Sequence, residues 1–150
     1  MKQRLLYVGL NVHKNTTDVA IANGRSNGKV WSYGKIDCTL DALNKLIKKL
    51  QDGDKELRFV YEAGPCGYQI YRYLDAKGIH CSVVAPSMIP RRSGDRIKTD
   101  RRDAINLARL FRAGELTSIY VPTVEDEAIR DLVRCRDDMK RFERKARQRL

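Results

Sequence analysis

The sequence predicts an α/β fold in which an antiparallel three-stranded meander leads into alternating helices and strands, followed by a long C-terminal helix. Three observations carry this prediction. The chain opens with apolar segments separated by Asn-Gly pairs, helical periodicity alternates with short apolar runs over residues 39–113, and residues 124–150 place apolar residues seven apart. Alternation of the two element types is typical of a sheet covered by helices.

The meander occupies the first third of the chain. Residues 5–12 and 16–22 are apolar runs of strand length, and residues 29–34 alternate between apolar and polar side chains. The pairs Asn23-Gly24 and Asn27-Gly28 lie between the second and third runs, and Asn-Gly is a strong turn signal. We therefore expect three strands that follow one another antiparallel.

Helices and strands then alternate. Thr39 is a suitable N-cap for a helix over residues 40–50, and Gly78 fits the C-terminal end of a helix over residues 68–77. Strands are expected at residues 57–61 and 79–85, a loop at 86–95, a helix at 100–113, a linker at 114–123 and a helix at 124–150. The last helix carries a heptad-like seam of Leu132, Met139 and Ala146, which suits pairing with another helix or packing on the domain.

Composition narrows the class of function. The formal net charge is +11, which predicts an anionic partner, with nucleic acid the leading candidate. No apolar run approaches the roughly 20 residues that span a bilayer, and the N-terminus does not have the form of a signal peptide, so we expect a cytoplasmic protein with no membrane partner. The four cysteines form no CxxC pair, so a zinc site is not expected.

Four oxygen-bearing side chains are candidates for a metal site. Asp100 and Asp103 share one face of the expected helix, one turn apart, inside a basic segment. Glu62 ends a strand immediately before a Gly-Pro loop, and Asn11 lies near the end of the first strand. If the two strands are neighbours, these side chains converge where α/β sheets commonly bind ligands. Carboxylate and amide oxygens suit Mg²⁺ or Mn²⁺, and two such ions about 3.5–4 Å apart are used to cleave phosphodiesters.

Basic residues crowd the loop and first turn around the paired aspartates: Arg91, Arg92, Arg96, Lys98, Arg101 and Arg102. They are candidates for contacts with a phosphate backbone. The alternative is that Asp100, Asp103 and these arginines neutralise one another on a solvated helix.

At finer detail the chain resembles the N-terminal domain of the DEDD insertion-sequence transposases, which include pilin-gene inverting recombinases and bridge-RNA-guided elements. Four segments carry the resemblance, in order and spacing: YVGLNVHK at 7–14, YEAGPCGY at 61–68, PSMIPRR at 86–92 and KTDRRDA at 98–104. The resemblance covers essentially all 150 residues, and its last two segments are the most specific. It implies an RNase H/RuvC-like mixed sheet.

In that family the acidic quartet is Asp, Glu, Asp, Asp, which implies catalytic and metal-binding roles for Glu62, Asp100 and Asp103. The first position is Asn11, a neutral amide where the family has a carboxylate. Loss of one well-placed electrostatic group typically costs about 10²–10³ in rate. We therefore expect a metal-dependent DNA recombinase domain that is inactive or weakly active.

The resemblance also implies a domain plan and further partners. Residues 1–114 correspond to the RuvC-like domain, and residues 115–150 to a linker and the start of a helical, coiled-coil connector. The family's C-terminal domain with its nucleophilic serine is not matched here, so complete recombination is not expected of these residues alone. The implied partners are DNA, a structured guide RNA, and a second copy that forms a homodimer or higher oligomer through the C-terminal helix.

Two other functions remain open from the sequence. One is a stand-alone nuclease that resolves Holliday junctions, which needs only this domain and a dimer interface. The other is a non-catalytic fragment that binds nucleic acid or dimerises with a full-length recombinase.

Overall fold

A computed structural model describes residues 4–25, 27–91 and 99–150 of the chain. Its five-stranded sheet has the order β3-β2-β1-β4-β5. The strands are β1 (Arg4–Val12), β2 (Thr16–Asn23), β3 (Val30–Asp37), β4 (Lys55–Glu62) and β5 (His80–Val84). The helices are α1 (Leu40–Leu50), α2 (Gln69–Ala76), the 3-10 turn η1 (Pro86–Met88), α3 (Asp100–Ala113) and α4 (Val124–Gln148).

The sheet is mixed, as predicted. The β1, β2 and β3 strands form the antiparallel meander, while β4 pairs parallel to β1 and β5 pairs parallel to β4. The predicted end of the third strand is wrong: β3 does not end at Gly34 but continues to Asp37. Gly34 has φ +124°, and the pairing with β2 shifts register between Val19 and Ala20. The strand therefore continues past Gly34 through a local irregularity in the pairing.

Local signals explain the helix boundaries. The Thr39 hydroxyl accepts a hydrogen bond from the Ala42 amide at 3.1 Å and caps α1, whose apolar face is buried. Thr99 caps α3 in the same way by accepting from the Arg102 amide at 3.3 Å, and α3 ends at Gly114, which has φ +72°. The predicted bounds of both α1 and α3 are confirmed.

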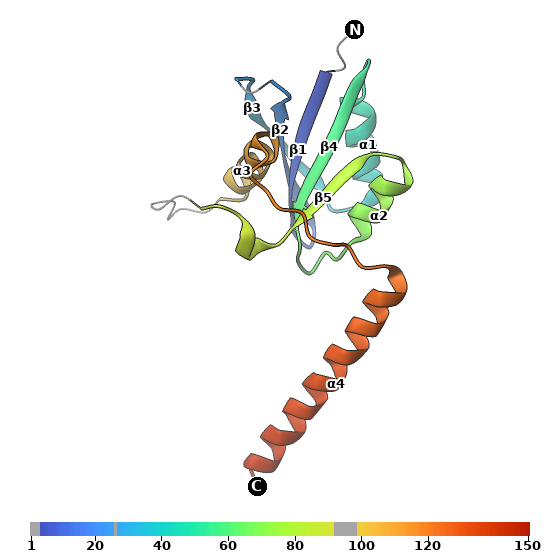
Figure 1. The fold of residues 1–150 in the computed structure, drawn as a ribbon, viewed down its shortest axis with the longest axis vertical. Helices are drawn as coiled ribbons and strands as arrows, with labels where there is room; N and C mark the ends of the chain where they lie inside the picture. Colours follow the sequence, from blue (N-terminus) through green and yellow to red (C-terminus); the bar gives the residue numbers. More distant parts are fainter. Residues whose placement is uncertain (1–3, 26, 92–98) are drawn as a thin grey trace. The chain divides into compact units, whose positions relative to one another are not determined.

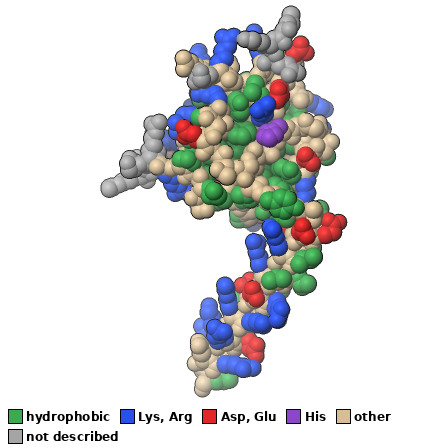
Figure 2. All heavy atoms as spheres, in the orientation of Figure 1, with side chains coloured by type: hydrophobic (Ala, Val, Ile, Leu, Met, Phe, Trp, Pro, Cys, Tyr) green, Lys and Arg blue, Asp and Glu red, His purple; other side chains and the backbone are tan. Residues whose placement is uncertain are grey.

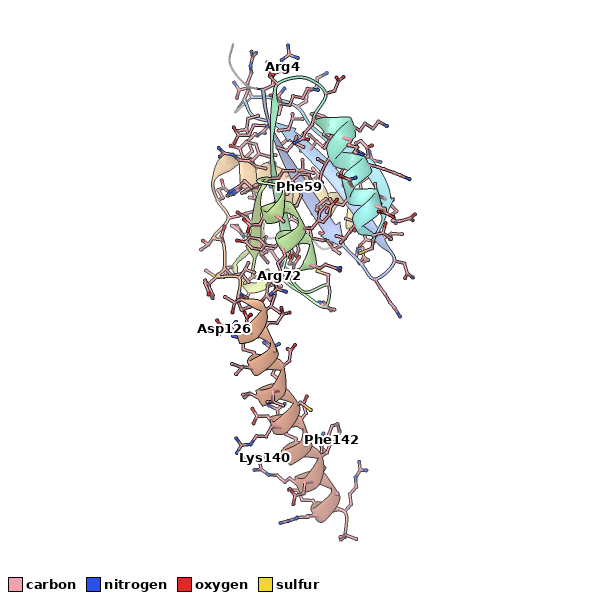
Figure 3. The ribbon with its side chains drawn as sticks, turned by 90° about the vertical axis from the view of Figure 1, so that its right-hand side faces the viewer. Arg4, Phe59, Arg72, Asp126, Lys140 and Phe142 are labelled. Atoms are coloured by element: carbon pink, nitrogen blue, oxygen red, sulfur yellow. The ribbon has the colours of Figure 1, made fainter. Side chains whose placement is uncertain are left out.

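The helices cover both faces of the sheet (Figure 1): α3 packs on one face, and α1 and α2 lie on the other. Alanines allow α3 to approach closely, because Ala20 and Ala22 of the sheet form one buried cluster with Ala104 and Ala108 of the helix. The opposite face contributes larger side chains, among them the fully buried Phe59 (Figure 3). The sheet is therefore buried on both sides, and α3 is held directly over β1.

The chain divides into two compact units, Met1–Ile119 and Tyr120–Leu150. The first contains the sheet and helices α1 to α3. The second contains α4, in which no residue is buried, and its Leu132, Met139 and Phe142 side chains are exposed. Within the described residues, no helix is long and apolar enough to cross a membrane.

Candidate functional site

Asn11 and Glu62 lie at the same end of the sheet, on neighbouring strands. The parallel register pairs Gly9 with Val60 and Leu10 with Tyr61, so the next residues, Asn11 and Glu62, lie side by side. Side chains alternate between the faces of a strand, and Gly9 and Val60 both face α3. Asn11 and the half-buried Glu62 therefore share the face that α3 covers.

The first turn of α3 brings the aspartates to this end of the sheet. The Asn11 side-chain amide donates a hydrogen bond to the backbone carbonyl of Asp100 at 3.2 Å, which links β1 to the start of α3. Asp100 is exposed and Asp103, one turn further on, is half-buried. Both also lie where the positive end of the helix dipole stabilises a carboxylate. Part of the reason for two acids at this position is therefore helix stability.

The structure adds two residues that were not among the predicted site residues. The His13 imidazole Nε2 lies 3.1 Å from Asp100 Oδ1. Asp18 of β2 lies directly across from Asn11 in the antiparallel register. Ligand atoms of His13, Asp18 and Asp100 all lie within 4.8 Å of one another, and among the described residues Glu62 and Asp103 are outside this group.

Asp18 is the unusual member of the group because it is buried. Its residue exposure is 5%, and its Oδ2 has no hydrogen-bond partner among the residues that the structure describes. Within the described part of the chain, the Lys35 Nζ lies 3.9 Å from Oδ2, on a largely exposed side chain. The sequence contains one signal for this residue: Asp18 is the single acid of β2 and directly precedes its apolar run. A buried carboxylate with an unmet acceptor, near other oxygen donors, fits a site for a divalent cation.

The structure describes half of the six predicted nucleic-acid contacts. Arg91, Arg101 and Arg102 are exposed, and the last two lie in the first turn of α3 beside Asp100. Arg92, Arg96 and Lys98 lie outside the described residues.

Lys and Arg side chains also run along α4 (Figure 2), interspersed with acidic ones. Arg147 contacts Glu143 at 2.6 Å and Arg141 contacts Asp138 at 3.9 Å within this helix. Those two arginines therefore form ion pairs within α4, so their charge alone does not indicate a nucleic-acid partner for this helix.

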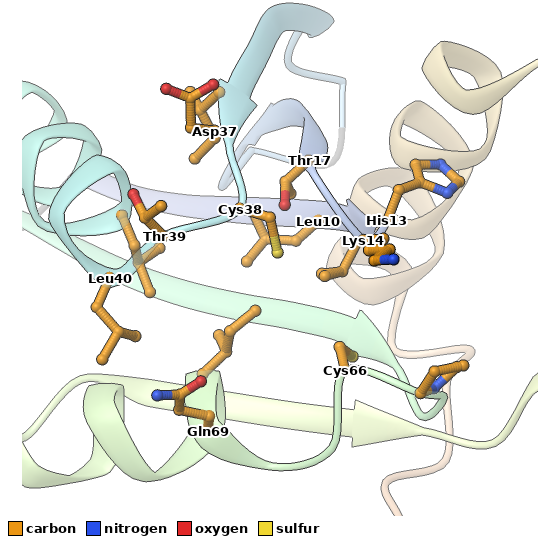
Figure 4. A pocket seen from close by; sticks show the side chains of 15 residues that line it. Leu10, His13, Lys14, Thr17, Asp37, Cys38, Thr39, Leu40, Cys66 and Gln69 are labelled. Atoms are coloured by element: carbon orange, nitrogen blue, oxygen red, sulfur yellow. The ribbon is translucent and has the colours of Figure 1, made fainter.

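A pocket lies on the other face of the sheet, between the strands and the N-terminal ends of α1 and α2 (Figure 4). It has a volume of about 740 Å³ and is lined mainly by apolar side chains together with Cys38, Thr39 and Cys66. None of the predicted metal-binding residues lines it. Burial raises the pKa of the Cys66 thiol, and nearby Cys38 adds to this effect, so the thiol stays protonated and is a poor nucleophile at neutral pH. His13 lies at the rim of the pocket and points toward α3.

Known proteins resemble the chain at the level of sequence and fold. Residues 8–150 match the family model described as a transposase of the DEDD, IS110 type. A putative transposase y4qE from Sinorhizobium fredii is 47% identical over 133 residues, which cover 89% of this chain and 34% of that protein. The transposase for insertion sequence element IS1533 from Leptospira borgpetersenii is 42% identical over 149 residues, covering 99% of this chain and 43% of that protein.

Among solved structures, the chain is similar to RuvC from Thermus thermophilus, with a TM-score of 0.49 and 8% sequence identity over 76% of this chain and 99% of that one. The present chain spans less than half the length of the two curated relatives. Because the family match extends over nearly all of its residues, the chain belongs to the IS110 family of DEDD transposases.

Proposed function

We propose that this chain is the part of a DNA transposase that binds divalent metal and nucleic acid for strand cleavage and transfer, with cleavage impaired by Asn11. The observation that carries the proposal is that the C-terminal ends of the neighbouring strands β1 and β4 meet the first turn of α3. There Asn11 and Glu62 are neighbours on the face under α3, and Asn11 is hydrogen-bonded to Asp100.

The proposed metal ligands are Asn11, Glu62, Asp100 and Asp103, with Mg²⁺ or Mn²⁺ as the ion. Hard oxygen donors on rigid elements suit these ions. When bound, the ion supplies positive charge where negative charge develops during phosphodiester cleavage. The protein's own part is to hold the four side chains: strand register positions Asn11 and Glu62, and the Thr99 cap fixes the first turn of α3.

DNA is the proposed substrate, and a structured guide RNA is a proposed second partner. Support comes from the net charge of +11 and from the exposed Arg101 and Arg102 beside the proposed metal ligands. Guanidinium groups in the first turn of α3 can hold a phosphate backbone near the carboxylates and screen their repulsion. The two relatives, a putative transposase and the transposase for an insertion sequence element, also support DNA as the substrate.

We expect the Glu62→Gln variant to bind Mg²⁺ at least about 10-fold more weakly than the unchanged chain, because a neutral amide replaces a proposed carboxylate ligand. Isothermal titration calorimetry measures the affinity. Glu56→Gln is the matched control, since Glu56 lies on the same strand at its other end and pairs with Arg58 at 2.9 Å. Equal Mg²⁺ affinity in the Glu62→Gln variant and the unchanged chain would contradict the proposed site.

A second copy of the chain is proposed to pair through α4. Leu132 and Met139, which begin successive heptads, are 71% and 67% exposed, and Cys135 and Phe142 lie between and after them along the same seam. An uncovered seam of this kind is also what a non-catalytic dimerisation fragment needs. Residues 115–150 are accordingly proposed to form a linker and the start of a helical connector.

The double variant Leu132→Asn/Met139→Asn is expected to be monomeric at concentrations where the unchanged chain is dimeric, because two polar amides would enter the seam. Sedimentation velocity across a concentration series measures the change. Val133→Asn is the control, since Val133 is 50% exposed on the same helix but lies outside the seam. A chain that is monomeric throughout, or a double variant that dimerises as before, would rule out this interface.

A further inference from the structure

We propose that His13, Asp18 and Asp100 form a divalent-metal site of mixed nitrogen and oxygen donors, in which Asp18 of β2 supplies the negative charge that Asn11 does not. The inference rests on the proposed function, since it concerns the same end of the sheet. It adds two ligands, His13 and Asp18, to the four proposed above.

The geometry places three donors from three elements around one point. The donor atoms of His13, Asp18 and Asp100 lie within 4.8 Å of one another, and His13 Nε2 is 3.1 Å from Asp100 Oδ1. Metal–donor bonds of about 2.0–2.2 Å hold neighbouring donors roughly 3–4 Å apart, so a small contraction is enough. The turn after β1 is itself held, because the His13 amide donates to the Thr16 carbonyl at 2.9 Å.

Burial of Asp18 is the independent sign that a cation belongs here. The side chain is 7% exposed, and Oδ2 accepts no hydrogen bond from any described residue. An ionised carboxylate in such surroundings is unfavourable unless it is paired. The Lys35 ammonium at 3.9 Å is too far away for a hydrogen bond and its side chain is 61% exposed, so it is a weak partner. A bound cation would supply a closer pairing than the one that Lys35 gives Asp18.

Asn11 makes the charge balance of this site consistent. It lies opposite Asp18 across the strands and uses its amide as a donor to the Asp100 carbonyl. A carboxylate in its place would face Asp18 directly, and like charges opposite each other destabilise a strand pair. With Asn11, the carboxylates of Asp18 and Asp100 carry two negative charges, which a divalent ion neutralises, and His13 binds as a neutral donor.

The donor set also selects the ion. Imidazole nitrogen suits first-row transition metals, whereas Mg²⁺ is held chiefly by oxygen donors and water. The group of His13, Asp18 and Asp100 is therefore expected to bind Mn²⁺ in preference to Mg²⁺.

The test uses the two histidines of the chain as reporters. His13 is a proposed ligand. His80 lies at the start of β5, opposite Arg58 in the strand register, whereas Glu62 lies opposite Val84 at the other end of β5. In ¹⁵N-labelled protein, substoichiometric Mn²⁺ is expected to broaden the His13 imidazole signals strongly and those of His80 much less. By calorimetry, Asp18→Asn and His13→Gln are each expected to lower Mn²⁺ affinity at least 10-fold.

Controls separate this site from the one that contains Glu62. Asp37→Asn removes an exposed carboxylate at the end of β3 and is expected to leave Mn²⁺ affinity unchanged. Circular dichroism checks that Asp18→Asn folds, and His13→Gln alters an exposed side chain whose loss leaves the core intact. Selective broadening of His13 that persists in Glu62→Gln supports the inference even if the four-residue site fails.

Two results would overturn the inference. One is unchanged Mn²⁺ affinity in both Asp18→Asn and His13→Gln; if Glu62→Gln weakens Mg²⁺ binding at the same time, the proposed function survives without it. The other is equal broadening of His13 and His80, or no Mn²⁺ binding by the unchanged chain.

Discussion

Asn11→Asp is expected to raise the rate of Mg²⁺-dependent DNA cleavage by about 10²–10³, the largest gain that one substitution in this chain should produce. The change restores a carboxylate beside Glu62 and Asp100, at the position where the family pattern has an acid. It also removes the amide donor to the Asp100 carbonyl and adds a negative charge opposite Asp18, so the metal-free protein should lose stability. Cleavage of end-labelled DNA with and without Mg²⁺ measures the rate.

The matched control is Asn15→Asp, which adds the same charge in the exposed turn between β1 and β2. It is expected to leave the rate unchanged, whereas Glu62→Gln in the Asn11→Asp background should abolish the gain. Comparing duplex with four-way-junction substrates also tests the stand-alone resolvase alternative. If the unchanged chain cleaved DNA as fast as Asn11→Asp, the idea that Asn11 impairs the site would be abandoned.

Gly9→Ala is expected to destabilise the domain by about 3 kcal/mol, which corresponds to a drop of roughly 6–12 °C in Tm. A Cβ at Gly9 would lie 2.6 Å from the Ala104 carbonyl oxygen and 2.7 Å from the Ala108 amide nitrogen. Both are backbone atoms of α3 and cannot rotate away, so the helix must move off the sheet. Asp100 and Asp103 would move with it, and metal affinity should fall along with stability. Thermal unfolding followed by circular dichroism measures the first effect.

Gly64→Ala provides the comparison, because no heavy atom lies within 4 Å of its added Cβ and Gly64 is not among the glycines with positive φ. Its Tm is expected to stay within a few degrees of the unchanged chain. If Gly9→Ala unfolded at the same temperature as Gly64→Ala, close contact between α3 and β1 would not be what holds the site together.

Much of the fold could be predicted from the sequence because its signals are local. Thr39 and Thr99 cap helices whose predicted bounds match the structure, and the meander follows from apolar runs separated by Asn-Gly turns. Gly34 is a local signal with two possible outcomes: the sequence pattern predicts a strand end there, but β3 continues past it and its pairing with β2 shifts register.

In the candidate site, too, some features follow from local sequence and others depend on contacts between distant elements. Residue identity and local periodicity are enough to predict that Asp100 and Asp103 lie one turn apart, that Glu62 ends a strand and that position 11 is an amide. The hydrogen bond from Asn11 to Asp100, the position of Asp18 opposite Asn11 and the contact of His13 with Asp100 of α3 are visible in the folded structure alone. These contacts join separate elements, and their distances depend on strand register and on how closely α3 packs over Gly9, neither of which local periodicity encodes.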